Sequence, residues 1–131
     1  MTGLDTNVLV RYIMQDDDVQ AKKATKLIES LTSEAPGFVA LVVVVELFWV
    51  LGGSYELSRG QVVSAFDALI RSKQLVIEKK DKVVRALRVY SSSTADFPDC
   101  LIERTANAAG CKRVMTFDVG ASKKAGMVLI A

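Results

Sequence analysis

Four acidic residues spread along the chain are the strongest candidates for chemistry: Asp5, Glu46, Asp99 and Asp118. Carboxylates gathered at one place repel one another and resist ionisation unless a cation neutralises them. Oxygen ligands suit Mg²⁺ or Mn²⁺, which keep several waters and bind phosphate oxygens readily. A metal-bound hydroxide could then attack a phosphodiester phosphorus. These acids therefore predict metal-dependent hydrolysis of a phosphodiester.

Three of these acids also have a simple structural interpretation. Asp5 and Asp118 could each cap a following helix, and Asp99 could favour a helix N-terminus behind Pro98. At these three positions, each residue taken alone leaves the structural and the chemical interpretation open.

Glu46 is harder to explain without a cation. The positions three and four residues away are apolar, so we expect its side chain to be buried. A buried lone carboxylate costs several kcal/mol or takes up a proton. The sequence nearby holds no basic partner. Glu46 is thus the acid that most favours a metal site.

Polar neighbours could hold these acids in place. Thr6 and Asn7 follow Asp5, and Thr116 precedes Asp118, so their hydroxyl and amide groups could donate hydrogen bonds to carboxylates. Asn7 could equally shape the turn from strand to helix. Asp96, three residues before Asp99, is a further acid that could approach the metal. An Asp in a loop before a helix is more often a helix cap.

Basic residues near the acids are candidates for contact with a phosphate backbone. Arg11 lies one to two helical turns after Asp5, and Lys123 and Lys124 follow Asp118 closely. Arg85 belongs to the densest basic group, residues 79–88, which is usually only a solvated helix face but could follow a polyanion.

Composition removes several classes of protein. The chain has no histidine, which excludes His-based triads and His-rich metal sites. Its 17 Lys and Arg nearly balance 15 Asp and Glu, so any contact with nucleic acid must be local. Cys100 and Cys111 lack metal-ligand spacing, and we expect both to be small buried residues of a protein in a reducing compartment.

Short apolar segments alternate with helical patterns, which predicts βαβ units. Strands are expected at residues 4–6, 38–41, 75–77, 113–116 and 128–130, with Ser58 capping the helix that precedes the third. The predicted fold class is α/β, with three α/β/α layers and a central, mostly parallel sheet of four to five strands. Ligands of such sheets bind at the carboxyl ends of the strands, where Asp5 and Asp118 fall.

The 131 residues have the length of one domain, and half of them are hydrophobic, so a single domain over 1–131 is expected. The long apolar run at residues 38–51 contains Glu46 and is too short to span a bilayer. No basic segment precedes an apolar stretch at the start of the chain. We expect a cytoplasmic protein without a membrane segment.

The same residues carry a resemblance to a known family. Asp5 to Val10, Glu46 in its apolar helix, Asp96 to Ile102 and Thr116 to Asp118 together resemble the ordered signature of PIN-domain nucleases, and more narrowly the VapC-type toxins of bacterial toxin-antitoxin pairs. The similarity covers essentially the whole chain. The sequence departs from the family pattern in two places. The segment before Leu4 is shorter than is common in relatives, and Val119 stands where relatives often have a polar or basic residue.

The resemblance implies a three-layer PIN-like fold and an endoribonuclease that stops growth by cutting RNA. It implies a Mg²⁺ or Mn²⁺ site on Asp5, Glu46, Asp99 and Asp118. It also implies a homodimer inhibited by a small antitoxin protein whose C-terminal segment lies across the catalytic groove. Arg11, Arg85, Lys123 and Lys124 are then candidates for binding the RNA substrate.

Other protein classes fit the sequence less well. A phosphoaspartate receiver needs an acidic pair at its first strand, where Asp5 stands alone, and a dehalogenase-like phosphatase needs a second Asp where Asn7 stands. A catalytically weak PIN-like module that only binds RNA or protein, and a nuclease acting on DNA, stay open as alternatives.

Overall fold

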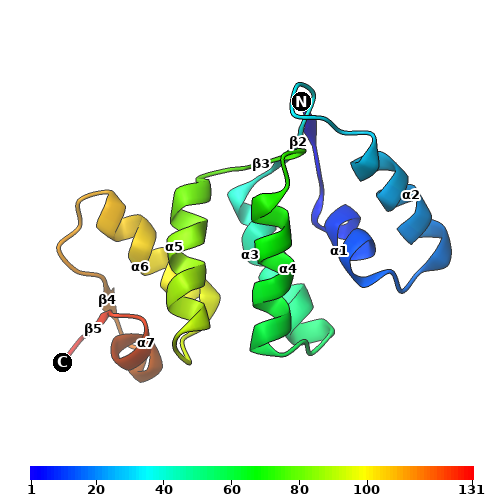
Figure 1. The fold of residues 1–131 in the computed structure, drawn as a ribbon. Coiled ribbons are helices and arrows are strands. Elements are labelled where there is room, and N and C mark those ends of the chain that lie inside the picture. The colour runs from blue at the N-terminus through cyan, green and yellow to red at the C-terminus, as the bar shows by residue number, and fades with distance from the viewer. The chain divides into compact units, whose positions relative to one another are not determined.

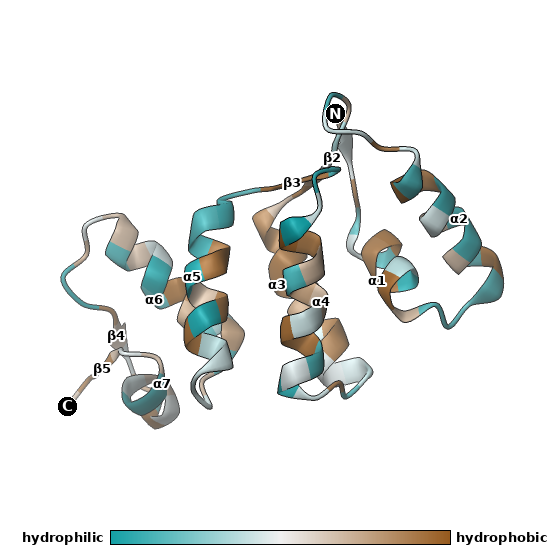
Figure 2. Ribbon diagram, viewed as in Figure 1, coloured by the Kyte–Doolittle hydropathy of each residue, from teal (hydrophilic) through white to brown (hydrophobic).

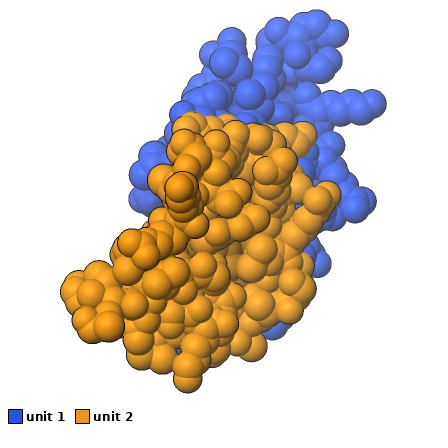
Figure 3. Space-filling model, turned by 90° about the vertical axis from the view of Figure 1, so that its left-hand side faces the viewer, with its two compact units in different colours: residues 1–78 blue, residues 79–131 orange.

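Short strands and helices alternate along the whole chain in the computed structural model, which describes residues 1–131 (Figure 1). The residues form two compact units, Met1–Glu78 and Lys79–Ala131 (Figure 3). All strand pairs in both units are parallel. The predicted α/β fold class with parallel strands is therefore confirmed.

The first unit is built around a three-stranded sheet in the order β1-β2-β3. Its strands are β1 (Thr2–Gly3), β2 (Gly37–Val39) and β3 (Leu75–Ile77). Gly37 pairs with Thr2 on one side and Leu75 on the other. A Cβ atom at Gly37 would lie 2.8 Å from side-chain atoms of Leu31 and Leu4, so glycine suits this crowded position.

Helices pack beside this sheet in the first unit. They are α1 (Thr6–Met14), α2 (Asp18–Glu29), α3 (Leu41–Trp49) and α4 (Arg59–Arg71), and a π-helical turn, η1 (Val50–Ser54), continues α3. Figure 2 shows that α3 is hydrophobic over most of its length. Fully buried side chains from the strands and helices form the core, among them Leu9, Val39, Leu47, Leu51, Val62 and Phe66.

The second unit pairs two long helices with a small parallel sheet. Its elements are α5 (Lys80–Ser91), α6 (Phe97–Ala108), β4 (Met115–Thr116), α7 (Val119–Lys124) and β5 (Val128–Leu129). The rings of Tyr90 and Phe97 meet edge to face, with centroids 6.1 Å apart, where α5 passes to α6. Both residues are buried, so this contact anchors the segment before α6.

Two local expectations are corrected by the structure. The first strand lies at Thr2–Gly3 rather than residues 4–6, because Asp5 caps α1 and Thr6 already belongs to that helix. Leu4 still donates its backbone N–H to Phe38 at 3.0 Å, so the pairing with β2 extends to it. Cys100 is buried as expected, but Cys111 is exposed because it follows the turn that ends α6.

No helix of the protein combines the length and the apolar character that crossing a bilayer requires.

We expect the capping box of α4 to contribute measurably to stability. Ser58 accepts a hydrogen bond from the Gln61 N–H, and the Gln61 side chain accepts one from the Ser58 N–H. Ser58→Ala should lower the free energy of unfolding by about 1 kcal/mol in a urea titration. Ser64→Ala, an exposed site within the same helix, is the matched control and should cost nothing. Equal effects of both variants would contradict the capping role.

Candidate functional site

Asp5 stands where the chain turns from β1 into α1. It is the N-cap of that helix, and its Oδ1 accepts a hydrogen bond from the Thr6 N–H at 2.8 Å. The carboxylate is exposed. Because only one oxygen is used by the cap, the other stays available to a ligand. The structural and the chemical interpretations of Asp5 are therefore compatible.

Thr6 links the two acids of the first unit. It is only 6% exposed, and its Oγ1 donates a hydrogen bond to Glu46 Oε1 at 3.1 Å. Its backbone N–H binds Asp5 at the same time. The sequence suggested that Thr6 holds a carboxylate, and the structure identifies Glu46 as the one its hydroxyl contacts.

Glu46 itself is exposed, so the expectation that it is buried was wrong. The buried side of α3 is formed by Val43, Val44, Leu47 and Phe48. Glu46 instead shares the other side with Val42 and Trp49, which are 65% and 56% exposed. Because α3 is apolar all round, residue spacing alone could not show which side faces the core.

The start of α3 is held by a residue far along the chain. Ala40, the N-cap, makes no side-chain hydrogen bond to the helix. Instead Glu78 Oε1 accepts a hydrogen bond from the Leu41 N–H at 2.7 Å, and the Glu78 N–H donates to Val39 at 2.9 Å. The helix that carries Glu46 is thus fastened to the end of β3.

Three acids of the second unit line one small cavity. Asp96, Asp99 and Asp118 surround a space of about 130 Å³ at the start of α6 and α7, and Lys124 lines the same space. Asp99 lies in the first turn of α6, which Pro98 helps to begin. The structure thereby brings together two of the predicted ligands and the acid that was expected to act as a cap.

The carboxyl of Asp99 is the perturbed group of this cavity. Burial raises the pKa of Asp99 above its ordinary value of 3.8, and the nearby charges of Asp96 and Asp118 raise it further. A divalent cation between such oxygens would remove this repulsion. The donor chemistry of the cavity therefore fits Mg²⁺ or Mn²⁺.

Local hydrogen bonds fix the side chain of Asp118 but not that of Asp96. Asp118 caps α7, and its Oδ1 accepts from the Ala121 N–H at 3.1 Å. Thr116 Oγ1 accepts from the Asp118 N–H at 3.0 Å, so this hydroxyl holds the backbone of Asp118 rather than its carboxylate. Asp96 begins α6 without any side-chain cap bond, which leaves its carboxylate to the cavity.

The four acids are divided between the two units. Asp5 and Glu46 belong to Met1–Glu78, and Asp99 and Asp118 to Lys79–Ala131. No three acidic side chains lie at the spacing of a formed metal site. The structure therefore defines two pairs of candidate ligands, each with its own positioning contacts.

Arg11 is tied into a network that sequence reasoning missed. Its Nε donates to Gln20 Oε1 at 2.6 Å, and its Nη1 lies 3.2 Å from the Tyr55 hydroxyl and 3.4 Å from Asp16. The Tyr55 hydroxyl donates to Asp16 at 2.7 Å, which lowers the pKa of Asp16 below its ordinary value. Asn7 is exposed and lines a pocket beside this network.

Positive charge is concentrated in the second unit. Residues Lys79–Ala131 hold 10 Lys and Arg against 5 Asp and Glu, whereas residues 1–78 hold 7 against 10. Arg85, Lys123 and Lys124 are exposed and form no ion pair. The nearly balanced charge of the whole chain therefore includes a second unit that is clearly basic. The three acidic residues of that unit that form no ion pair all line the cavity.

Comparisons with known proteins identify the family to which the sequence is similar. Residues 4–127 match the family model of the PIN domain. The chain is also similar to the protein named VapC ribonuclease of Aquifex aeolicus (strain VF5), with 25% identity over 118 residues that cover 89% of this chain and 87% of that protein.

We expect replacement of Asp99 to stabilise the metal-free protein. Its pKa is raised in the folded state, so the folded chain binds the proton more tightly and stability falls as pH rises through this interval. In EDTA at neutral pH, Asp99→Asn should raise the melting temperature by roughly a few degrees. The difference should vanish below pH 3.8, where Asp99 is protonated in both states.

Asp81→Asn is the matched control in the same unit. Lys82 lowers the pKa of Asp81, so its removal should not raise the melting temperature at neutral pH. A rise of equal size in both variants would show that general loss of negative charge, and not crowding of carboxylates at the cavity, explains the effect.

Proposed function

The chain belongs to the PIN-domain family, and on that premise we propose that it is a Mg²⁺- or Mn²⁺-dependent endoribonuclease, the toxin of a toxin-antitoxin pair. The observation that carries the proposal is the crowding of Asp96, Asp99 and Asp118 at one cavity, where the pKa of Asp99 is raised. Carboxylates held together in this way are poised to bind a cation.

Asp5, Glu46, Asp99 and Asp118 are the residues that would hold the metal. When bound, Mg²⁺ or Mn²⁺ supplies a water of lowered pKa and neutralises charge on the phosphate. The chain's own contribution is positioning, because Thr6 holds a Glu46 oxygen and the cap bonds of Asp5 and Asp118 fix their carboxylates. Asp96 adds negative charge beside Asp99 and strengthens the attraction for a cation.

The basic unit supports RNA as the substrate. Arg85, Lys123 and Lys124 carry unpaired charge that could bind phosphates on either side of the cleaved bond. Lys124 lines the acid cavity itself, so its ammonium group can balance a phosphate that approaches Asp99 and Asp118. Arg11 would contribute from the first unit.

The remaining parts of the proposal concern assembly. The family match runs from residue 4 to residue 127, across both units, which supports a single domain. A cytoplasmic homodimer, inhibited by a small antitoxin protein, is proposed because the chain is similar to a protein named VapC ribonuclease.

The direct test is cleavage of total RNA by purified protein in Mg²⁺. We expect activity that EDTA abolishes and that Asp5→Asn reduces at least about a hundredfold, since even residues supporting a metal ligand contribute ten- to hundredfold. Asp17→Asn makes the same change at the N-cap of α2 and should retain activity. Cleavage that survives EDTA or Asp5→Asn would contradict the mechanism.

A single-stranded DNA of the same base sequence distinguishes the alternatives. We expect RNA to be cut and DNA to be spared. Cleavage of DNA in preference would assign a DNA nuclease, and binding of RNA without Mg²⁺-dependent cleavage of either strand would assign a binding module.

Thr6 offers a test of positioning that is separate from the ligands. Thr6→Val keeps the shape of this buried side chain but removes the hydroxyl that donates to Glu46. We expect cleavage to fall about ten- to hundredfold while the circular dichroism spectrum is unchanged. Thr6→Ser keeps the hydroxyl and should restore most activity. Equal activity of the Val and Ser variants would show that the Thr6 hydroxyl has no role.

A further inference from the structure

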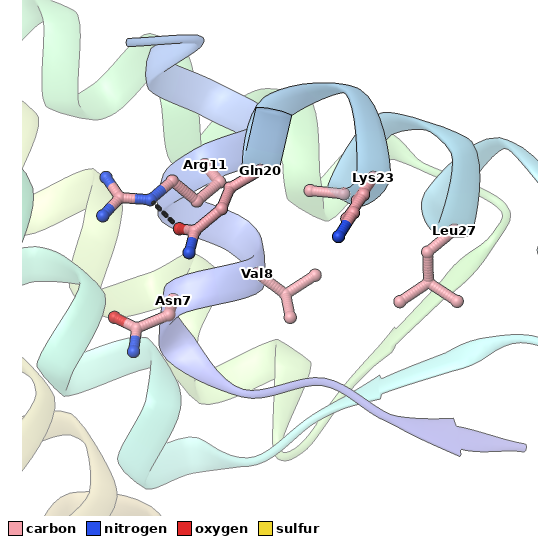
Figure 4. Close-up of a pocket in the computed structure, with 7 residues that line it drawn as sticks. Asn7, Val8, Arg11, Gln20, Lys23 and Leu27 are labelled. Carbon is pink, nitrogen blue, oxygen red and sulfur yellow. Dashed lines mark hydrogen bonds between the residues drawn. The ribbon is translucent and has the colours of Figure 1, made fainter. Parts of the chain in front are cut away.

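A pocket of about 300 Å³ lies between α1 and α2 in the first unit (Figure 4). All of its lining residues belong to that unit, whereas the cavity of Asp96, Asp99 and Asp118 is lined by residues of the second unit. Four of its residues are polar and three are apolar: Asn7, Arg11, Gln20 and Lys23, and Val8, Ala24 and Leu27.

The polar side of the pocket consists mainly of hydrogen-bond donors. Gln20 Oε1 already accepts from Arg11 Nε, so the Gln20 amide has its NH₂ group left for a ligand (Figure 4). Arg11 uses Nε and Nη1 for the protein, which leaves its Nη2 available. Lys23 is exposed and forms no ion pair, and no acidic residue lines the pocket. These groups select a ligand rich in acceptors and negative charge.

The apolar side requires more of the ligand than negative charge. Ala24 is buried, Leu27 is 37% exposed, and Val8 lies beside them from α1. A free phosphate or a metal complex would leave this surface in water, whereas a nucleotide has a flat base to cover it. Asn7 and Gln20 are amides, which can exchange hydrogen bonds with base edges.

The position of the pocket along α1 relates it to Asp5. Asn7 is two residues and Arg11 six residues after Asp5, so the pocket begins near the Asp5 end of α1 and extends about 6 Å along the helix. An RNA strand with one phosphate at Asp5 can place a neighbouring nucleotide there. An acidic peptide would accept hydrogen bonds from the same donors, but it has no phosphate to place at Asp5.

We propose that this pocket binds one nucleotide of the substrate RNA, with its base on Val8, Ala24 and Leu27 and a flanking phosphate at Lys23. The inference rests on the proposed ribonuclease function and adds a specificity subsite to it. The identity of the base held by Asn7 and Gln20 then sets which RNA sites are cut.

Two adjacent lysines of α2 provide a matched pair for the test. Lys23 lines the pocket, whereas Lys22 is also exposed but lines a different depression with Gln15 and Lys26. We measure binding of a fluorescein-labelled single-stranded RNA by anisotropy in EDTA, over a range of salt concentrations. Lys23→Ala should weaken the Kd about tenfold and reduce the salt slope by about 0.7. Lys22→Ala should change the Kd by less than about twofold.

A photo-crosslinker at position 27 locates the bound nucleotide. Leu27 is replaced by p-benzoylphenylalanine, and the crosslinked RNA base is mapped by primer extension. We expect a crosslink within a few nucleotides of the cleavage site, and the same crosslinker at position 19, which is exposed on α2 but does not line the pocket, should give none.

The outcomes separate this subsite from the proposed function. Loss of RNA binding in Lys23→Ala without any RNA cleavage by the unaltered protein would support the subsite and contradict the nuclease. Cleavage with equal Kd values for Lys22→Ala and Lys23→Ala, and no crosslink from position 27, would overturn the subsite alone. Unchanged RNA affinity of Lys23→Ala with weakened binding of an acidic peptide would assign the pocket to a protein and also overturn it.

Discussion

Repulsion between carboxylates is the constraint on which the rest of the site depends. In the second unit, burial raises the pKa of Asp99, and the neighbouring charges of Asp96 and Asp118 raise it further. A fold maintains such crowding only when its helices hold the acids there, as the starts of α6 and α7 do. A cation bound there would relieve this repulsion, so the packing that holds the acids together would also favour metal binding.

Asp5 and Asp118 are helix caps as well as proposed metal ligands. Asp5 and Asp118 each use one oxygen for a helix N-terminus, and the strands that precede them end within two residues. A helix N-terminus also favours negative charge, so a carboxylate suits both positions. Thr6 contacts both acids of the first unit, because its backbone N–H donates to Asp5 while its buried hydroxyl donates to Glu46.

The sequence predicted correctly those structural features that depend on neighbouring residues. The strand at Leu75–Ile77, the Ser58 cap and the parallel pairing follow from residue spacing and capping chemistry, and all are confirmed. The exposure of Glu46 could not be predicted, because α3 is apolar on every side and tertiary packing determines which side is buried. The network of Arg11 was missed because its partners lie 9 and 44 residues away.

Binding of Mn²⁺, followed by electron paramagnetic resonance in the absence of RNA, tests the central claim most directly. The unaltered protein is compared with Glu46→Gln from the first unit and Asp118→Asn from the second, each checked for folding by circular dichroism. We expect one set of tightly bound Mn²⁺ signals that both substitutions weaken strongly, because Glu46 and Asp118 are both proposed ligands of the metal. Undiminished Mn²⁺ binding in both variants would contradict the account.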